Sequence, residues 1–146
     1  MTVEHSGEQF GESALRLVIT LHRLVRSLRL GTGAPMLNPT QLLVLSHLID
    51  AGPTRIGELA GQAGTSQPTA TTVVAGMVAA GLVQRVPDTA DGRAVRVDLT
   101  EFGRATLLSL AGRQADLVRD RVRGLTVRER AVLAEALPLL EKLSRG

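Results

Sequence analysis

The chain has 146 residues, of which 44% are hydrophobic and 21% are charged, and its formal net charge is +3. This composition is typical of a globular protein with one domain or two small ones, and it argues against a disordered chain. The chain has no cysteine, which excludes disulfides, thiolate metal sites and cysteine nucleophiles. Phe10 and Phe102 are the only aromatic residues, too few to stack single-stranded bases.

Neither a targeting segment nor a membrane span is apparent in the sequence. The first ten residues carry no Lys or Arg, so no basic region precedes an apolar stretch. The longest uncharged run, residues 59–84, is interrupted by polar residues and glycines and falls short of a span of about 20 apolar residues. We therefore expect a soluble protein of the cytoplasm.

The N-terminal region predicts a polar tail over residues 1–11 and a helix over residues 12–30. Apolar residues recur in this helix at alternating spacings of three and four: Ala14, Val18, Leu21, Val25 and Leu28. Further leucines widen its apolar surface beyond this seam, so the helix needs cover on more than one side. In so small a protein, a second subunit is the expected cover.

Three shorter helices are predicted next. Asn38, Pro39 and Gln41 form a capping box with proline at the first helical position, which opens a helix to about residue 50. A short helix is expected over residues 54–62, followed by a tight break at Gly64. Ser66 then caps a helix to about residue 80, with these inward-facing apolar residues: Ala70, Val73, Val74 and Met77.

Two alternating segments, residues 82–86 and 95–99, predict a hairpin whose loop contains the turn dipeptide Asp91-Gly92. Val95, Val97 and Leu99 are expected on one face of the second strand. Helices are predicted over residues 101–123 and 126–144. The first carries another seam: Leu108, Ala111, Ala115, Val118 and Val122. The second opens on a capping box and contains Pro138, which should weaken or kink it.

Residues 56–75 have the spacing of a helix-turn-helix, and the hairpin that follows indicates a winged variant. The predicted fold is mainly α-helical, with a two- or three-stranded β-wing and a helical dimerisation region. The chain resembles the MarR-type (multiple antibiotic resistance regulator) transcription factors. The resemblance is carried by these runs: Leu37 to Gln41, Glu58-Leu59-Ala60, Ser66-Gln67, Gly81-Leu82-Val83, Asp91-Gly92-Arg93 and Leu99 to Gly103.

The resemblance implies an obligate homodimer held by its terminal helices. Residues 1–34 and 101–146 would form the dimerisation region, and residues 35–100 would form the DNA-binding winged helix-turn-helix. The helices starting at Ser66 would enter successive major grooves of a pseudo-palindromic operator, and Arg93 would enter the minor groove. Candidate DNA-binding residues are Ser66, Gln67, Pro68, Thr69, Thr71, Thr72, Arg85, Asp91, Arg93 and Arg96.

Several of these candidates have simpler interpretations. Ser66 and Thr69 suit plain helix capping, while Asp91 and Arg93 could form either an exposed turn pair or a fork that orients the guanidinium toward DNA. Arg85 and Arg96 suit phosphate contacts or solvated charges equally well. Residues 35–100 hold four basic and five acidic side chains, a balance of −1, which predicts a shallow salt dependence of DNA binding.

The family commonly binds small aromatic or anionic effectors, for which the candidate residues are His22, Arg26, Met36 and His47; packing or solvated surface are the alternatives. We expect neither metal, cofactor nor enzymatic activity, because no ligand spacing, phosphate loop or nucleophile arrangement is present. The predicted function is a homodimeric, sequence-specific transcriptional repressor relieved by an effector. The alternatives are a winged-helix protein-interaction module and a ligand-insensitive DNA-binding protein.

Overall fold

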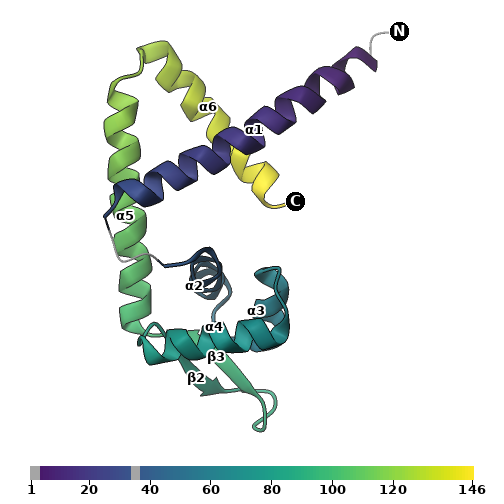
Figure 1. Cartoon of the computed structure of the whole chain (residues 1–146), viewed down its shortest axis with the longest axis vertical. Coiled ribbons are helices and arrows are strands. Elements are labelled where there is room, and N and C mark those ends of the chain that lie inside the picture. Colours follow the sequence, from purple (N-terminus) through teal and green to yellow (C-terminus); the bar gives the residue numbers. More distant parts are fainter. Residues whose placement is uncertain (1–3, 34–36) are drawn as a thin grey trace. The chain divides into compact units, whose positions relative to one another are not determined.

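The computed structural model describes residues 4–33 and 37–146, with side chains for residues 11, 13–33 and 37–146. Its elements in chain order are α1 (Glu4–Gly31), α2 (Pro39–Ala51), β1 (Thr54–Arg55), α3 (Ile56–Gln62), α4 (Gln67–Ala79), β2 (Val83–Pro87), β3 (Val95–Leu99), α5 (Glu101–Arg123) and α6 (Val127–Ser144) (Figure 1). The predicted class, mainly α-helical with a small β-wing, is confirmed.

The two predicted capping boxes are present. The Asn38 side chain accepts a hydrogen bond from the Gln41 backbone N–H at 2.8 Å, and the Gln41 side chain accepts one from the Asn38 backbone at 2.9 Å. Thr126 and Glu129 exchange the equivalent pair of bonds at the start of α6. α6 continues through Pro138 to Ser144. Side-chain caps satisfy first-turn amides, so these starts are specified locally.

Two predicted boundaries are wrong. α1 begins at Glu4, so the segment expected as a polar tail continues the helix. Once a helix is nucleated, each added residue gains a hydrogen bond without a new nucleation cost, which allows the polar start to be helical. Thr54 and Arg55, expected in the short helix, form strand β1, because they pair with β3 across the sheet.

The sheet has three antiparallel strands in the order β1–β3–β2. β1 pairs Thr54 with Val97 and Arg55 with Arg96. β2 pairs with β3 from Val83 opposite Leu99 to Pro87 opposite Val95. Pro87 therefore ends an edge strand, where the missing N–H costs no central hydrogen bond.

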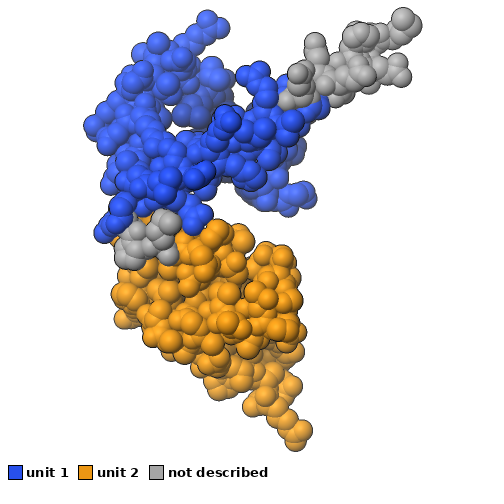
Figure 2. Space-filling view, in the orientation of Figure 1, with its two compact units in different colours: residues 1–33, 113–146 blue, residues 34–112 orange. Residues whose placement is uncertain are grey.

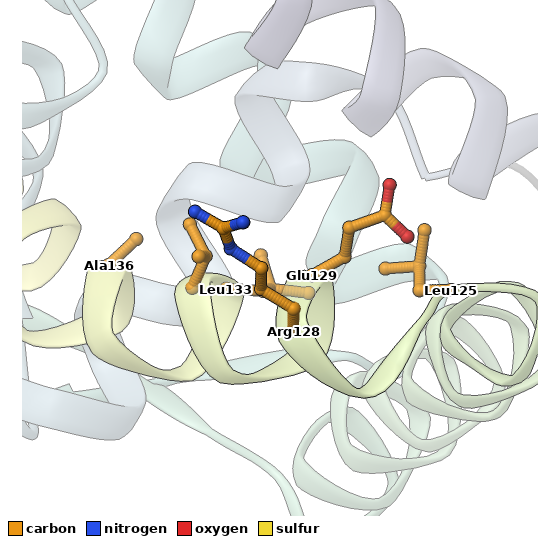
Figure 3. A pocket seen from close by; sticks show the side chains of 6 residues that line it. Leu125, Arg128, Glu129, Leu133 and Ala136 are labelled. Atoms are coloured by element: carbon orange, nitrogen blue, oxygen red, sulfur yellow. The ribbon is translucent and has the colours of Figure 1, made fainter.

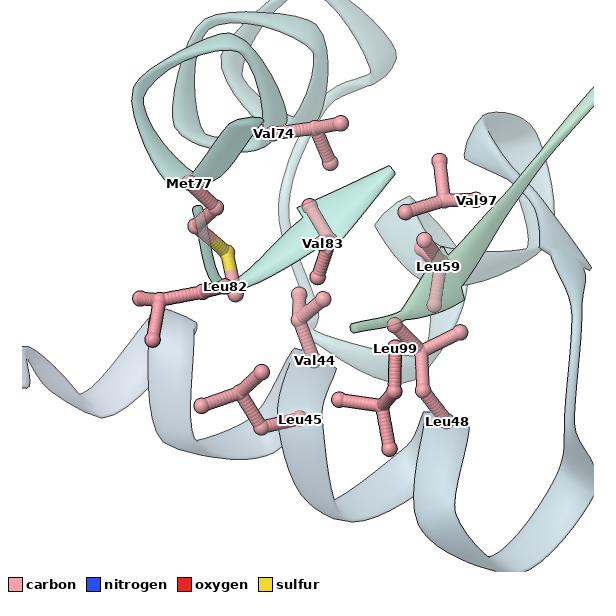
Figure 4. Packing of buried hydrophobic residues seen from close by; sticks show 10 residues of the cluster. All are labelled: Val44, Leu45, Leu48, Leu59, Val74, Met77, Leu82, Val83, Val97 and Leu99. Atoms are coloured by element: carbon pink, nitrogen blue, oxygen red, sulfur yellow. The ribbon is translucent and has the colours of Figure 1, made fainter. Parts of the chain in front are cut away.

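The hydrophobic core lies between helices α2, α3 and α4 and the sheet (Figure 4). Its buried members are Val44, Leu45, Leu48, Leu59, Val74, Met77, Leu82, Val83, Val97 and Leu99. Val95 was expected on the same inward face but is 48% exposed. It lies beside the wing loop, beyond the reach of the helices that cover Val97 and Leu99.

The chain divides into two compact units (Figure 2). We call residues 34–112 the winged unit and residues 1–33 with 113–146 the helical unit. All residues of the described chain that are buried lie in the winged unit. The helical unit has apolar helices without a buried core, although its α1 and α5 are joined by a hydrogen bond from Arg121 to Ser27 at 2.8 Å. Its assignment as a dimerisation region stays a prediction.

Candidate nucleic-acid interface

The turn between α3 and α4 depends on Gly64, whose φ is +63°. Glycine adopts this left-handed conformation without the steric cost that a Cβ imposes. The Ala63 N–H donates to the Leu59 carbonyl at 2.9 Å, and the Thr65 N–H donates to the Ala60 carbonyl at 3.0 Å, which closes the end of α3. The chain then starts α4 immediately at the Ser66 cap.

The N-terminal half of α4 presents a polar surface. The buried residues of the whole helix are Ala70, Val74 and Met77, which face the core. The exposed residues on the other side are those predicted from the sequence: Ser66, Gln67, Pro68, Thr69, Thr71 and Thr72. The structure therefore brings the predicted α4 candidates onto one accessible helix surface.

The hydroxyl groups on this surface already have partners within the helix. Ser66 Oγ accepts from the Thr69 N–H at 3.3 Å and lies 2.8 Å from Thr69 Oγ1, so the capping interpretation holds for this pair. Thr71 donates to the Gln67 carbonyl at 2.9 Å, and Thr72 donates to the Pro68 carbonyl at 3.1 Å. Thr71 and Thr72 can thus offer a partner an acceptor oxygen and a methyl group.

The wing loop between β2 and β3 is closed by its own backbone. The Asp88 N–H donates to the Ala94 carbonyl at 3.0 Å, and the Ala94 N–H donates to the Asp91 carbonyl at 3.0 Å. The Asp91 carboxylate accepts from the backbone N–H of Arg93 at 3.1 Å. Asp91 therefore shapes the turn, and within the described residues it forms no ion pair with the Arg93 guanidinium.

Arg93 and Arg85 are the exposed cations of the hairpin. Arg93 lies at the tip of the loop, and Arg85 lies on β2 opposite Val97 in the strand register. Within the described part of the chain, neither guanidinium makes a hydrogen bond or an ion pair. Both remain available to an external anion.

Arg96 is partly exposed but paired, because it belongs to a cluster around Asp88. We call Arg55, Asp88 and Arg96 the Asp88 cluster. Arg55 Nη2 lies 2.6 Å and Arg96 Nε 3.2 Å from Asp88 Oδ2. Arg96 Nη1 also donates to the Pro53 carbonyl at 3.0 Å. The Asp88 side chain is fully covered, so the cluster ties the base of the wing to β1.

The environment of Asp88 strongly favours its charged form. The Ala90 backbone N–H, which donates to Asp88 at 2.9 Å, and then the Arg55 guanidinium hold the pKa of Asp88 well below its ordinary value of 3.8. Burial opposes this shift, and Arg96 adds to it. Asp88 is therefore an anion throughout the range in which proteins are usually handled.

No pattern in the sequence indicated a role for Asp88 or Arg55. Arg55 was expected in a helix, so its position opposite Arg96 in the sheet could not be predicted. Arg55 and Asp88 are separated by 33 positions, so no local spacing reports their contact. The available signal was an acidic residue directly after an edge strand that contains Pro87, and this signal is weak.

The residues predicted for an effector lie on different elements. His22 and Arg26 are exposed on α1, whereas His47 is half-buried on α2. His47 Nε2 is buried, and within the described residues it has no hydrogen-bond partner. Met36 lies outside the described residues. The effector assignment therefore stays a prediction.

An apolar hollow of about 420 Å³ lies against α6 in the helical unit (Figure 3). Its described lining residues are Leu125, Arg128, Glu129, Val132, Leu133 and Ala136. None of the three described effector candidates is among them. Among the residues that the structure describes, no group of three or more His, Asp or Glu side chains is placed to hold a metal, and no helix is long and apolar enough to cross a membrane.

Comparison with known proteins agrees with this architecture. The sequence model of the MarR family matches residues 37–95, from the start of α2 to the start of β3. The HTH-type transcriptional regulator YsmB of Bacillus subtilis is 30% identical over 72% of each chain. The regulator Mb0904 of Mycobacterium bovis is 29% identical over 85% of this chain and 87% of its own. A MarR family protein from Bacillus stearothermophilus has the same fold, with a TM-score of 0.74, full coverage of both chains and 22% identity.

Proposed function

Because the chain belongs to the MarR family of transcriptional regulators, we propose that it works as a homodimer that binds duplex DNA through α4 and the wing of each subunit. The observation that carries this proposal is the pairing of an exposed polar helix start with an unpaired arginine at the wing tip. Five of residues 66–72 carry exposed polar side chains: Ser66, Gln67, Thr69, Thr71 and Thr72. Such side chains suit the edges of base pairs in a major groove.

Arg93 is the proposed minor-groove contact. Its guanidinium has no partner in the described residues, while the Asp91 carboxylate holds its backbone N–H. An arginine on an ordered turn loses less conformational entropy on binding than one on a loose loop. Arg85 on the neighbouring strand is the proposed phosphate contact.

The dimer proposal rests on the helical unit. Its described residues include no buried side chain, yet α1 exposes large apolar residues along most of its length. Both predicted seams remain accessible in the single chain: Leu21 is 36% exposed on α1, and Val118 is 37% exposed on α5. Apolar helices without a core need a partner surface, and a second copy of the same unit supplies one.

A two-fold dimer of such lobes favours a pseudo-palindromic operator. Two recognition helices that enter successive major grooves must be about 34 Å apart, which is one turn of B-DNA. We further propose repression in the cytoplasm that is relieved by a small effector. This requires an effector with higher affinity for a dimer state that does not match the operator.

The substitution Arg93→Ala tests the DNA-binding proposal. With about 1 kcal/mol lost per lobe, the affinity of the dimer for a fragment upstream of its own gene should fall about thirtyfold. Arg145→Ala removes the same charge from an exposed site at the end of α6 and serves as the control. Fluorescence anisotropy measures the affinity, and sedimentation checks that each variant remains a dimer.

The outcomes separate the candidate functions. If the wild-type dimer binds no genomic duplex even at low salt, the protein-interaction alternative replaces the DNA-binding proposal. Equal DNA affinities of the Arg93→Ala and Arg145→Ala variants would show that the wing tip is not part of the DNA interface. A screen of aromatic acids by thermal shift distinguishes the effector-controlled regulator from the ligand-insensitive one.

A further inference from the structure

The strand register places two arginines directly opposite each other. Arg55 on β1 and Arg96 on β3 are Cα partners in an antiparallel pair. Like charges at such a position destabilise a sheet. In this chain, both guanidinium groups instead converge on one carboxylate, Asp88, whose residue is only 3% exposed. Asp88 therefore offsets the repulsion between the two opposed arginines.

Asp88 also forms the base of the wing loop. Its backbone N–H closes the loop on the Ala94 carbonyl, and its carboxylate accepts the N–H of Ala90 at 2.9 Å. The same carboxylate is held from the other side by Arg55, which belongs to the body of the winged unit. In addition to the pairing of β3 with β1, the Asp88 side chain thus links the loop that carries Arg93 to β1.

The cluster has a second effect, on charge. Arg55 and Arg96 are half of the four basic residues in residues 35–100. Their side chains are 51% and 33% exposed, so solvent reaches both even though they are paired with Asp88. A phosphate must compete with Asp88 for either guanidinium. The cluster therefore holds two of these four positive charges against a carboxylate.

We infer that Asp88 is a positioning residue that sets DNA specificity, because it anchors the Arg93 wing and withholds Arg55 and Arg96 from non-specific phosphate contacts. The inference rests on the proposed DNA binding and deepens it. The Asp88 cluster then has opposite effects on specific and on non-specific duplexes. Loss of the Asp88 carboxylate weakens sequence-specific binding, which needs the wing held in position. It strengthens non-specific binding, which needs only positive charge.

The test compares Asp88→Asn with Asp98→Asn in the full-length dimer. Asp98, on β3, accepts a hydrogen bond from the Leu99 N–H at 2.8 Å and has no arginine partner among the described residues. Both substitutions raise the formal charge by one per chain, so they share any general electrostatic effect. The probes are the tightest duplex that the wild type selects from a random pool and a scrambled duplex of equal length.

For Asp88→Asn we expect about tenfold weaker binding of the selected duplex and severalfold tighter binding of the scrambled one. The logarithmic salt slope on the scrambled duplex should steepen by about 4, since Arg55 and Arg96 of both lobes add four phosphate contacts of about 0.9 each. Asp98→Asn should change the two affinities and the salt slope much less. In an Arg93→Ala background, Asp88→Asn should cost little additional affinity for the selected duplex, because both act through the wing.

Several results would overturn the inference. Equal losses on both duplexes, or an unchanged salt slope, would show that Asp88 only supports folding. If Asp88→Asn fails to fold, Arg55→Gln is the substitute, since it opens one ion pair at a half-exposed position. It should weaken binding to the selected duplex without steepening the slope, and an unchanged affinity would count against the inference. A wild type that binds neither duplex contradicts the proposed function itself.

Discussion

At the scale of single residues, the start of α5 shows why a glycine follows three positions after Thr100. The Thr100 hydroxyl accepts from the Gly103 N–H at 2.9 Å and lies 2.5 Å from the Gly81 carbonyl, so α5 begins directly against the end of α4. A Cβ on Gly103 would overlap the carbonyl oxygen of Leu82. The Leu-Thr-x-x-Gly run is therefore a packing requirement of the winged unit.

Replacing Gly103 with alanine should destabilise the protein by about 3 kcal/mol, because backbone atoms must move to admit the methyl group. Gly76→Ala is the matched control, since that glycine is also helical but meets nothing within 4 Å. It should gain up to about 1 kcal/mol through helix propensity. Urea denaturation of both variants measures the difference, and equal stabilities would contradict the close approach.

Thr71 tests whether α4 reads DNA through methyl groups, given the proposed DNA binding. Its hydroxyl donates to the Gln67 carbonyl, so Thr71→Val should preserve operator affinity. Thr71→Ser keeps the hydroxyl and should lose about 0.8 kcal/mol per lobe with the methyl group. Uracil in place of the contacted thymine should reproduce that loss. If Thr71→Val instead lowers the operator affinity, the hydroxyl and not the methyl group contacts the DNA.

At the scale of elements, carboxylates hold helix and strand ends in place. Hydrogen bonds from the Thr126 backbone and hydroxyl lower the pKa of Glu129 at the start of α6. The Ala90 N–H, and then Arg55, likewise lower the pKa of Asp88, the carboxylate that joins β1, β3 and the wing. Both groups bind protons less readily in the folded state than in the unfolded chain, so both make the folded state sensitive to acid.

The sign of this effect predicts the response to pH. A lowered folded-state pKa gives stabilisation that is complete above the unfolded value of 3.8 for Asp88 and is lost as pH falls further. The wild type should therefore lose stability steeply below about pH 4. Asp88→Asn should be less stable at neutral pH, with a flatter decline in acid. Thermal midpoints between pH 3 and pH 7 measure both slopes, and parallel curves would contradict the assignment.

At the scale of the whole molecule, the two units differ in how they bury apolar surface. The winged unit encloses its own core of ten buried apolar residues (Figure 4). The helical unit leaves Leu15, Val25 and Leu137 more than half exposed. A chain in which one unit has a complete core, while the described residues of the other have none, is expected to complete its second unit by association.

Leu21→Asp and Val118→Asp test this expectation. An aspartate in either seam places a charge in the proposed interface without a partner, so the folded dimer should be lost. Val95→Asp is the control, because that valine is also accessible, at 48% exposure, but lies on the wing. Sedimentation velocity at micromolar concentration measures the state of each variant. A folded, soluble monomer from either seam variant would count against the assigned interface.

Local chemistry explains how much of the fold was accessible from the sequence. The capping boxes at Asn38 and Thr126, the turn at Gly64 and the alternation in β3 involve residues within a few positions of one another. Their patterns therefore predicted the helix-turn-helix, its wing and the exposed polar surface of α4. The cap of Ser66 was likewise predictable, because its partner Thr69 lies one turn away.

Tertiary structure decided the features whose partners are distant in the chain. β1 is a strand only because β3 pairs with it, and Val95 is exposed only because the core ends before it. Arg55, Asp88 and Arg96 meet because the sheet brings three separate segments together. Hydrogen bonds within one turn depend only on neighbouring residues, so the sequence predicts them. Strand pairing and charge clustering depend on which segments the folded core places side by side.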